Sequence, residues 1–147
     1  MTQTTSQHLS SKPTTIDARG PRFAALITTV VLVTALATHS IWVIAFQLIV
    51  FAIGALRGPQ FTPYAWIFRK FIRQHLKGEV LTEDIRPPQF AQTVGFLFAL
   101  VATAGLIAHV PALFVIAAGA ALAAAFLNAA FNYCLGCEVY LLLLRLR

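Results

Sequence analysis

The chain has 147 residues, of which 59% are hydrophobic and only 11% are charged, whereas soluble domains carry about 25% charged residues. So short a chain has too little interior to bury this many apolar side chains, which excludes an ordinary soluble domain and a large Rossmann or barrel enzyme. The net charge of +6 does not indicate a nucleic-acid partner, because the basic residues lie in three segments separated by long uncharged stretches. This pattern is typical of a protein that crosses a lipid bilayer several times.

The N-terminal residues 1–15, rich in Thr, Ser and Gln, are typical of a disordered cytoplasmic tail. The uncharged stretch that follows, residues 23–56, is too long for one crossing, which takes about 20 residues. It divides at Thr38-His39-Ser40 into two short crossings, 23–37 and 41–56. A cleaved secretory signal ending near Ala37 is the alternative, but the mature chain would then begin directly in another apolar segment.

Two identically spaced motifs each precede an apolar hairpin. Because the spacing is identical, we predict a duplicated two-helix unit, with repeat one at 17–78 and repeat two at 84–147. Two similar helix entries that arose independently are the alternative. The first motif is Asp17-x-Arg19-x-Pro21-x-Phe23, the second is Asp84-x-Arg86-x-Pro88-x-Phe90, and alanine follows both.

Residues 62–78, between the hairpins, have the spacing of an amphipathic helix. Thr62 can cap its start and Gly78 its end. Basic residues on one face and aromatic residues on the other favour a helix lying on an anionic membrane surface, and docking of a partner protein is the alternative. The predicted apolar face consists of Tyr64, Ile67, Phe68, Phe71, Ile72 and Leu76.

The second uncharged stretch, residues 90–137, divides at His109-Val110-Pro111, since proline favours a new helix start. Its crossings are 91–108 and 112–131. With four crossings, all basic segments lie on one side, so both termini are expected in the cytoplasm of a bacterial inner membrane. The predicted fold is all-α, a single four-helix membrane domain over residues 16–147.

Helix packing is predicted from the polar and small residues that lie at membrane depth. Gln47, Asn128 and Asn132 each need a partner inside the bundle, either to fix helix packing or to line a polar path. Small residues such as Gly95, Ala99 and those near Gly119 favour close helix packing.

The two cysteines, Cys134 and Cys137, are spaced C-L-G-C. Positions i and i+3 share a helix face, so the sulfurs can form a disulfide or hold one metal ion. The N–H groups of a new helix would favour a Cys134 thiolate. Gly136 permits close approach of another backbone, and Glu138 would raise a neighbouring thiol pKa unless it points away.

Three interpretations of this pair remain. The cysteines are small apolar residues at a helix end, a dithiol that exchanges electrons or sulfur, or half of a metal site that only a homo-oligomer could complete with four ligands. At the reducing cytoplasmic face, a permanent structural disulfide is not expected. The chain itself predicts no metal and no cofactor.

Together, the Arg-x-Pro-x-Phe entries, Gly58-Pro59 and the C-terminal C-x-G-C resemble an uncharacterised bacterial family of small membrane proteins, known as a domain of unknown function. The resemblance covers residues 16–147, and Cys134, Gly136 and Cys137 are its most specific element. Such proteins are often encoded beside thioredoxin-like and rhodanese-type sulfurtransferase proteins, so the resemblance implies a partner that handles thiols or sulfur.

We therefore expect a membrane-anchored dithiol, with Cys134 attacking and Cys137 resolving, that is at most a participant in thiol–disulfide or sulfur-transfer chemistry rather than an enzyme. An accessory membrane subunit without chemistry is the second hypothesis. A transporter of small solutes or sulfur compounds, lined by the three polar residues, is the third.

Overall fold

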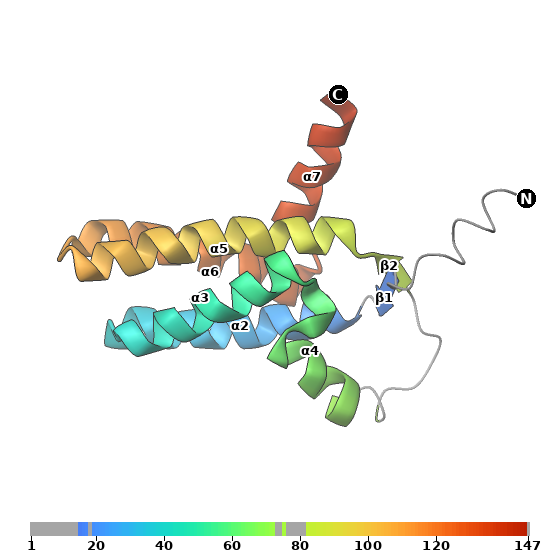
Figure 1. The fold of residues 1–147 in the computed structure, drawn as a ribbon, viewed down its shortest axis with the longest axis horizontal. Coiled ribbons are helices and arrows are strands. Elements are labelled where there is room, and N and C mark those ends of the chain that lie inside the picture. Colours follow the sequence, from blue (N-terminus) through green and yellow to red (C-terminus); the bar gives the residue numbers. More distant parts are fainter. Residues whose placement is uncertain (1–14, 18, 73–74, 76–81, 147) are drawn as a thin grey trace, which may run out of the picture.

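The computed structural model describes residues 15–17, 19–72, 75 and 82–146. Two hairpins of long helices lie side by side along one axis (Figure 1). The first consists of α2 (Arg19–Thr38) and α3 (Ile41–Leu56), and the second of α5 (Arg86–Ile107) and α6 (Pro111–Phe131). Short elements gather at one end of the bundle: strands β1 (Thr15–Asp17) and β2 (Thr82–Asp84), the 3₁₀ turn η1 (Pro59–Phe61), helix α4 (Pro63–Ile67), the π-helical turn η2 (Phe68–Ile72) and helix α7 (Leu135–Leu146).

Local sequence explains where the long helices begin and end. Both hairpins reverse at a histidine with left-handed backbone, His39 at φ 52° and His109 at φ 61°. Ser40 then caps α3 by accepting a hydrogen bond from the backbone N–H of Val43. Helices α2 and α5 begin at Arg19 and Arg86, earlier than the sequence predicts, because proline is tolerated in a first helical turn.

The bundle is packed through small side chains. Helix α2 packs against α6, and α3 packs against α5, in addition to the contacts within each hairpin. Close backbone approach of this kind is typical of helices in lipid. Gly119, in contrast to expectation, faces open space. The large fully buried apolar side chains are Leu32, Ile44 and Phe114, and the buried alanines are Ala24, Ala25, Ala35, Ala99, Ala102, Ala117, Ala118 and Ala121.

The outer surface of the bundle is strongly apolar. Trp42 is 81% exposed and Ile116 is 70% exposed, which would be costly in water. Three helices, α2, α5 and α6, are long and apolar enough to cross a membrane, whereas α3 has 16 residues and is shorter. The described structure is therefore that of a helical protein suited to a membrane.

A two-stranded ladder joins the starts of the two hairpins. Strands β1 and β2 are antiparallel, with Thr15 opposite Asp84 and Asp17 opposite Thr82. The sequence pattern places Thr15 in the tail and Asp17 and Asp84 in the entry motifs, and it does not predict their pairing. It brings together two segments that are far apart in the chain, and both hairpins consequently enter the bundle from the same end (Figure 1).

The helix between the hairpins departs from the regular pattern that was predicted. Thr62 caps α4 by accepting from the N–H of Ala65, as expected. Tyr64 and Phe68 are buried, but Phe71 is 52% exposed. The wider turn of η2 interrupts the regular helical spacing, so Phe71 is exposed whereas Phe68 is buried. Residues 73–74 and 76–78 of the predicted helix lie outside the described residues.

Candidate functional site

The end of α6 sets the position of the cysteines. Asn132 adopts a left-handed backbone with φ 55°, and its N–H donates to the carbonyl oxygen of Asn128. Asparagine tolerates this conformation and commonly ends a helix there. Asn132 is exposed, so the expectation that it has a partner inside the bundle was wrong. The chain turns, and α7 leaves at a steep angle to the long helices, on the side opposite α4 (Figure 1).

Cys134 and Cys137 are joined as a disulfide at the start of α7, with their Cα atoms 5.2 Å apart. The backbone N–H of Cys137 donates to the Sγ of Cys134, 3.1 Å away, so this sulfur occupies the capping position of the helix. Both cysteines are half-buried. The backbone therefore supplies the donor that favours negative charge on Cys134. A permanent disulfide is not expected at a reducing face, whereas the structure pairs the two sulfurs as a disulfide.

Two contacts fix α7 against α5. A Cβ atom added to Gly136 would lie 2.6 Å from the Cα of Ala91, so only glycine allows the two helices to approach this closely. One turn later, the rings of Phe90 and Tyr140 are 5.5 Å apart. The cysteine pair is thus positioned by the second hairpin, although the remainder of α7 is exposed.

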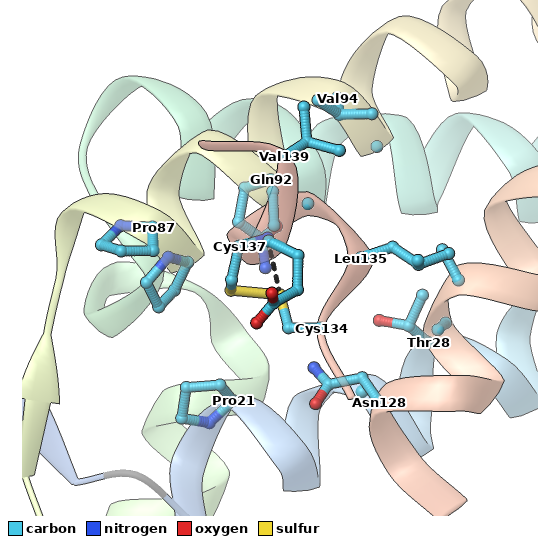
Figure 2. A pocket seen from close by; sticks show the side chains of 18 of the residues that line it. Pro21, Thr28, Pro87, Gln92, Val94, Asn128, Cys134, Leu135, Cys137 and Val139 are labelled. Atoms are coloured by element: carbon cyan, nitrogen blue, oxygen red, sulfur yellow. Dashed lines mark hydrogen bonds between the residues drawn. A yellow bond between two sulfur atoms is a disulfide. The ribbon is translucent and has the colours of Figure 1, made fainter. Parts of the chain in front are cut away.

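The disulfide forms part of the wall of a cavity of about 670 Å³, bounded by α2, α5, α6 and α7. Figure 2 shows the two sulfurs and the Asn128 carboxamide facing the same hollow. Asn128 is half-buried, and none of the hydrogen bonds among the described residues uses its carboxamide. The volume is within the range of small-molecule sites, about 300–1,000 Å³.

Charged side chains from two helices also line this cavity. The Nε of Arg22 donates to the carbonyl oxygen of Ala129 at 3.1 Å, and its Nη2 donates to that of Ala130 at 3.5 Å. Glu138 is an exposed part of the same lining, so a cation and an anion both accompany the cysteines. Arg22 was not predicted as a site residue. The sequence signal for it is that both motifs carry a long polar side chain between proline and phenylalanine, Arg22 in the first and Gln89 in the second.

Gln47 has a different environment from the other predicted polar residues. It is fully buried, and its Oε1 accepts a hydrogen bond of 2.7 Å from the Tyr64 hydroxyl of α4. Burial raises the pKa of the Tyr64 phenol, which therefore remains a donor. Asn128 and Asn132 line the cavity, but Gln47 does not. The structure thus does not bring the three residues of the hypothetical polar path together.

The family model described as "Domain of unknown function (DUF4395)" matches residues 16–145. The chain belongs to this family. No curated protein and no solved structure matches it.

The DUF4395 match contains both entry motifs and the cysteine pair. In the second motif, Asp84 accepts from the backbone N–H and the guanidinium of Arg86, and these hydrogen bonds hold the pKa of its carboxyl below the ordinary value. In the first, Asp17 ends β1, Arg19 begins α2, and Phe23 packs on Phe68 with ring centroids 5.7 Å apart.

The prolines of the two motifs have a related placement. Pro21 and Pro88 both line the cavity beside the disulfide.

Among the described residues, no three His, Cys, Asp or Glu side chains gather as metal ligands would. Of the predicted site residues, the cavity therefore brings together the two cysteines, Gly136, Glu138, Asn128, Asn132, Asp84, Pro21 and Pro88.

Proposed function

We propose that this DUF4395 protein is a membrane-embedded thiol–disulfide exchange protein. The observation that carries the proposal is the Cys134–Cys137 disulfide at the start of α7, with the Cys134 sulfur accepting a backbone hydrogen bond in the wall of a cavity. A disulfide closed over so few residues constrains the unfolded chain little. Exchange chemistry therefore explains the pair better than a purely structural role.

The proposed membrane arrangement has four crossings, α2, α3, α5 and α6. The three longer helices meet the length requirement on their own, and α3 runs beside α5 within the same bundle. Positive charge at the end that carries β1, α4 and α7 favours placing this end in the cytoplasm of a bacterial inner membrane. The cysteines would then face the cytoplasm at headgroup level.

Contacts at this end also support a duplicated architecture. Arg22 of α2 donates to carbonyls at the end of α6, and Gln89 of α5 donates to the Ala55 carbonyl at the end of α3, 2.9 Å away. Arg22 and Gln89 have equivalent places in their motifs. We propose that the hairpins are repeats related by a two-fold axis along the membrane normal, in which only the second repeat carries cysteines.

The exchange reaction conserves atoms and electrons. In the reduced protein, the Cys134 thiolate attacks a disulfide of a soluble partner, breaking its S–S bond and releasing one partner thiol. The Cys137 thiolate then attacks Cys134 Sγ in the mixed disulfide. This closes the Cys134–Cys137 bond and releases the second partner thiol. Two electrons and two protons pass to the partner, and the reverse sequence oxidises a partner dithiol. A thioredoxin-like or sulfurtransferase protein is the proposed partner.

Trapping tests this proposal. In native membranes, Cys137→Ser cannot resolve a mixed disulfide, so it should accumulate adducts that a reductant releases, whereas the matched Cys134→Ser variant should accumulate far fewer. Mass spectrometry would identify the attached thiol. If neither variant yields adducts although both are inserted at normal levels, the exchange function is wrong and the accessory-subunit hypothesis replaces it.

A further inference from the structure

The cavity beside the disulfide extends far into the bundle. At its outer end it is lined by Asp84 and Glu138, and at its inner end by Phe98 and Ala120. From Pro87, the first residue of α5 in the lining, to Phe98, the helix rises by about 16.5 Å at 1.5 Å per residue. In the proposed membrane arrangement this is more than half of a hydrocarbon layer about 30 Å thick. The cavity thus joins the headgroup level, where the cysteines lie, to the middle of the membrane.

The chemistry of the lining changes along this length. The deep part is largely apolar and includes Phe51, Val94 and Ala121, and its polar groups are the buried hydroxyl of Thr28 and the carboxamide of Gln92. Hydrogen-bond donors, the Arg22 guanidinium and the Asn128 carboxamide, lie towards the cysteine end. The occupant that fits has an apolar body and a polar head that accepts hydrogen bonds, with the head next to sulfur.

We propose that the cavity binds a membrane-soluble quinone, which serves as the electron acceptor for Cys134 and Cys137. An acyl chain would fill the deep part equally well, but it offers no redox group to the disulfide in the wall. A quinone head has carbonyl oxygens that can accept from Arg22 and Asn128. The inference rests on the proposed exchange function and names the second substrate class for the same site.

The electron balance closes without a further cofactor. The two cysteine thiols lose two electrons and two protons and form the Cys134–Cys137 bond, and the quinone gains both to become a quinol. Exchange with a soluble dithiol then reduces the disulfide again. The net reaction transfers two electrons and two protons from a soluble dithiol to the membrane quinone pool. Glu138, an exposed carboxylate of the lining that directly follows Cys137 in the chain, can carry a proton between the cysteines and water.

Adjacent alanines on α6 provide a matched test. Ala124 lines the cavity and is half-buried, whereas Ala123 is exposed and is not part of the lining. Ala124→Leu fills the space that the quinone body would occupy, and Ala123→Leu adds the same side chain on the outside. Each purified full-length protein is reduced in lipid nanodiscs without oxygen and mixed with decylubiquinone, whose fully substituted ring cannot add thiols. Two quantities are recorded. The first is the loss of quinone absorbance, and the second is closure of the disulfide, measured by alkylating the thiols that remain.

The wild-type protein and Ala123→Leu should reduce the quinone at similar rates, and Ala124→Leu should be slower by about tenfold, the effect of a modest overpacking penalty. Oxidation by an excess of a small water-soluble linear disulfide is measured in parallel. It should be equal in the wild-type protein and Ala123→Leu, and in Ala124→Leu it should change much less than the quinone reaction. If this small disulfide oxidises the pair but the quinone does not, or if both leucine variants react alike with the quinone, the quinone site is wrong while the exchange function stands. If neither oxidant closes the disulfide, the exchange function itself fails.

Discussion

The Nε of Arg22 donates to the carbonyl oxygen of Ala129 across 3.1 Å, so a cation from the first hairpin is attached to the last turn of the helix that leads to the cysteines. A positive charge in this position offsets the negative end of the α6 dipole. It also favours a thiolate at the cavity that Arg22 and Cys134 both line. The structure therefore connects the entry motif to the reactivity of the cysteine pair.

Arg22→Gln retains a hydrogen-bond donor but removes this charge. We expect the Cys134 thiol to have a higher pKa in the variant, and its alkylation at neutral pH to slow by several-fold, since one pKa unit corresponds to about tenfold in thiolate at a pH below both values. The measurement is the rate of iodoacetamide labelling against pH in a Cys137→Ser background. Arg57→Gln, which removes an exposed cation stacked on Phe61, is the control, and an equal effect there would remove Arg22 from this role.

Gly136→Ala should separate α7 from α5. The added Cβ would lie 2.6 Å from both Cα and Cβ of Ala91, so the helices must shift, at a cost of about 1–3 kcal/mol of unfolding free energy. Thermal unfolding in detergent should show a lower Tm. Gly119→Ala adds the same atom into open space and should be neutral or stabilising by up to about 1 kcal/mol. Equal Tm values for both variants would contradict the tight contact.

Tyr64→Phe should destabilise the bundle by about 1–3 kcal/mol, because the buried carboxamide of Gln47 loses its hydroxyl partner. Adding Gln47→Leu should restore part of this loss, since the unpaired polar group is then gone. Chemical unfolding of the two single variants and the double variant gives the coupling. Tyr133→Phe, at a half-exposed ring, is expected to change little. If the losses of unfolding free energy caused by Tyr64→Phe and Gln47→Leu simply add in the double variant, the hydrogen bond between these two side chains does not stabilise the fold.

Protonation of Asp84 should weaken the start of α5. Hydrogen bonds from Arg86 hold the pKa of this carboxyl below its ordinary value of 3.8. The stabilisation is therefore present above that value and is lost as the pH falls through the lower pKa of the folded protein. Both side chains are largely exposed, so the effect should be below about 1 kcal/mol. Asp84→Asn should reduce the difference in Tm between pH 6 and pH 3, and an unchanged difference would contradict the assignment.

The proposed membrane topology places the histidine turns and the C-terminal helix on opposite sides. In a background where Cys134 and Cys137 are both serine, His109→Cys should react with a membrane-impermeant maleimide added to intact spheroplasts. Arg145→Cys should react only after the membrane is opened. Both positions are exposed, so their labelling depends only on the side of the membrane on which they lie. Labelling of Arg145→Cys from outside would reverse the orientation.

The sequence predicted the hairpins well because the relevant signals are local. Absence of charge delimits the long helices, and the turns carry His39 and His109, where the backbone becomes left-handed. The Gly136 contact was partly predictable, because a glycine between two cysteines permits close approach, although its partner Ala91 was not. The pairing of Thr15 with Asp84 and the π turn after Ile67 depend on tertiary contacts that no short pattern records.

The cavity could not be predicted from local sequence either, because contacts between distant segments of the chain form its wall. Its wall combines Arg22 from the start of the chain with Cys134 near the end, and the two meet only because α2 packs on α6. Gln47 was singled out as polar, but its burial against Tyr64 required knowledge of where α4 folds back. Residue type indicated that each of these side chains needs a partner, and the fold determined which one.

The β1–β2 ladder has a consequence for the integrity of the chain. One strand belongs to each half, and α2 and α3 pack on α6 and α5 of the other half, so the larger buried cluster draws its side chains from both halves. A backbone nick between residues 72 and 82 would therefore leave a single particle. Two separately translated polypeptides, one ending and the other beginning in that interval, would be expected to find each other in the bilayer and reconstitute the site.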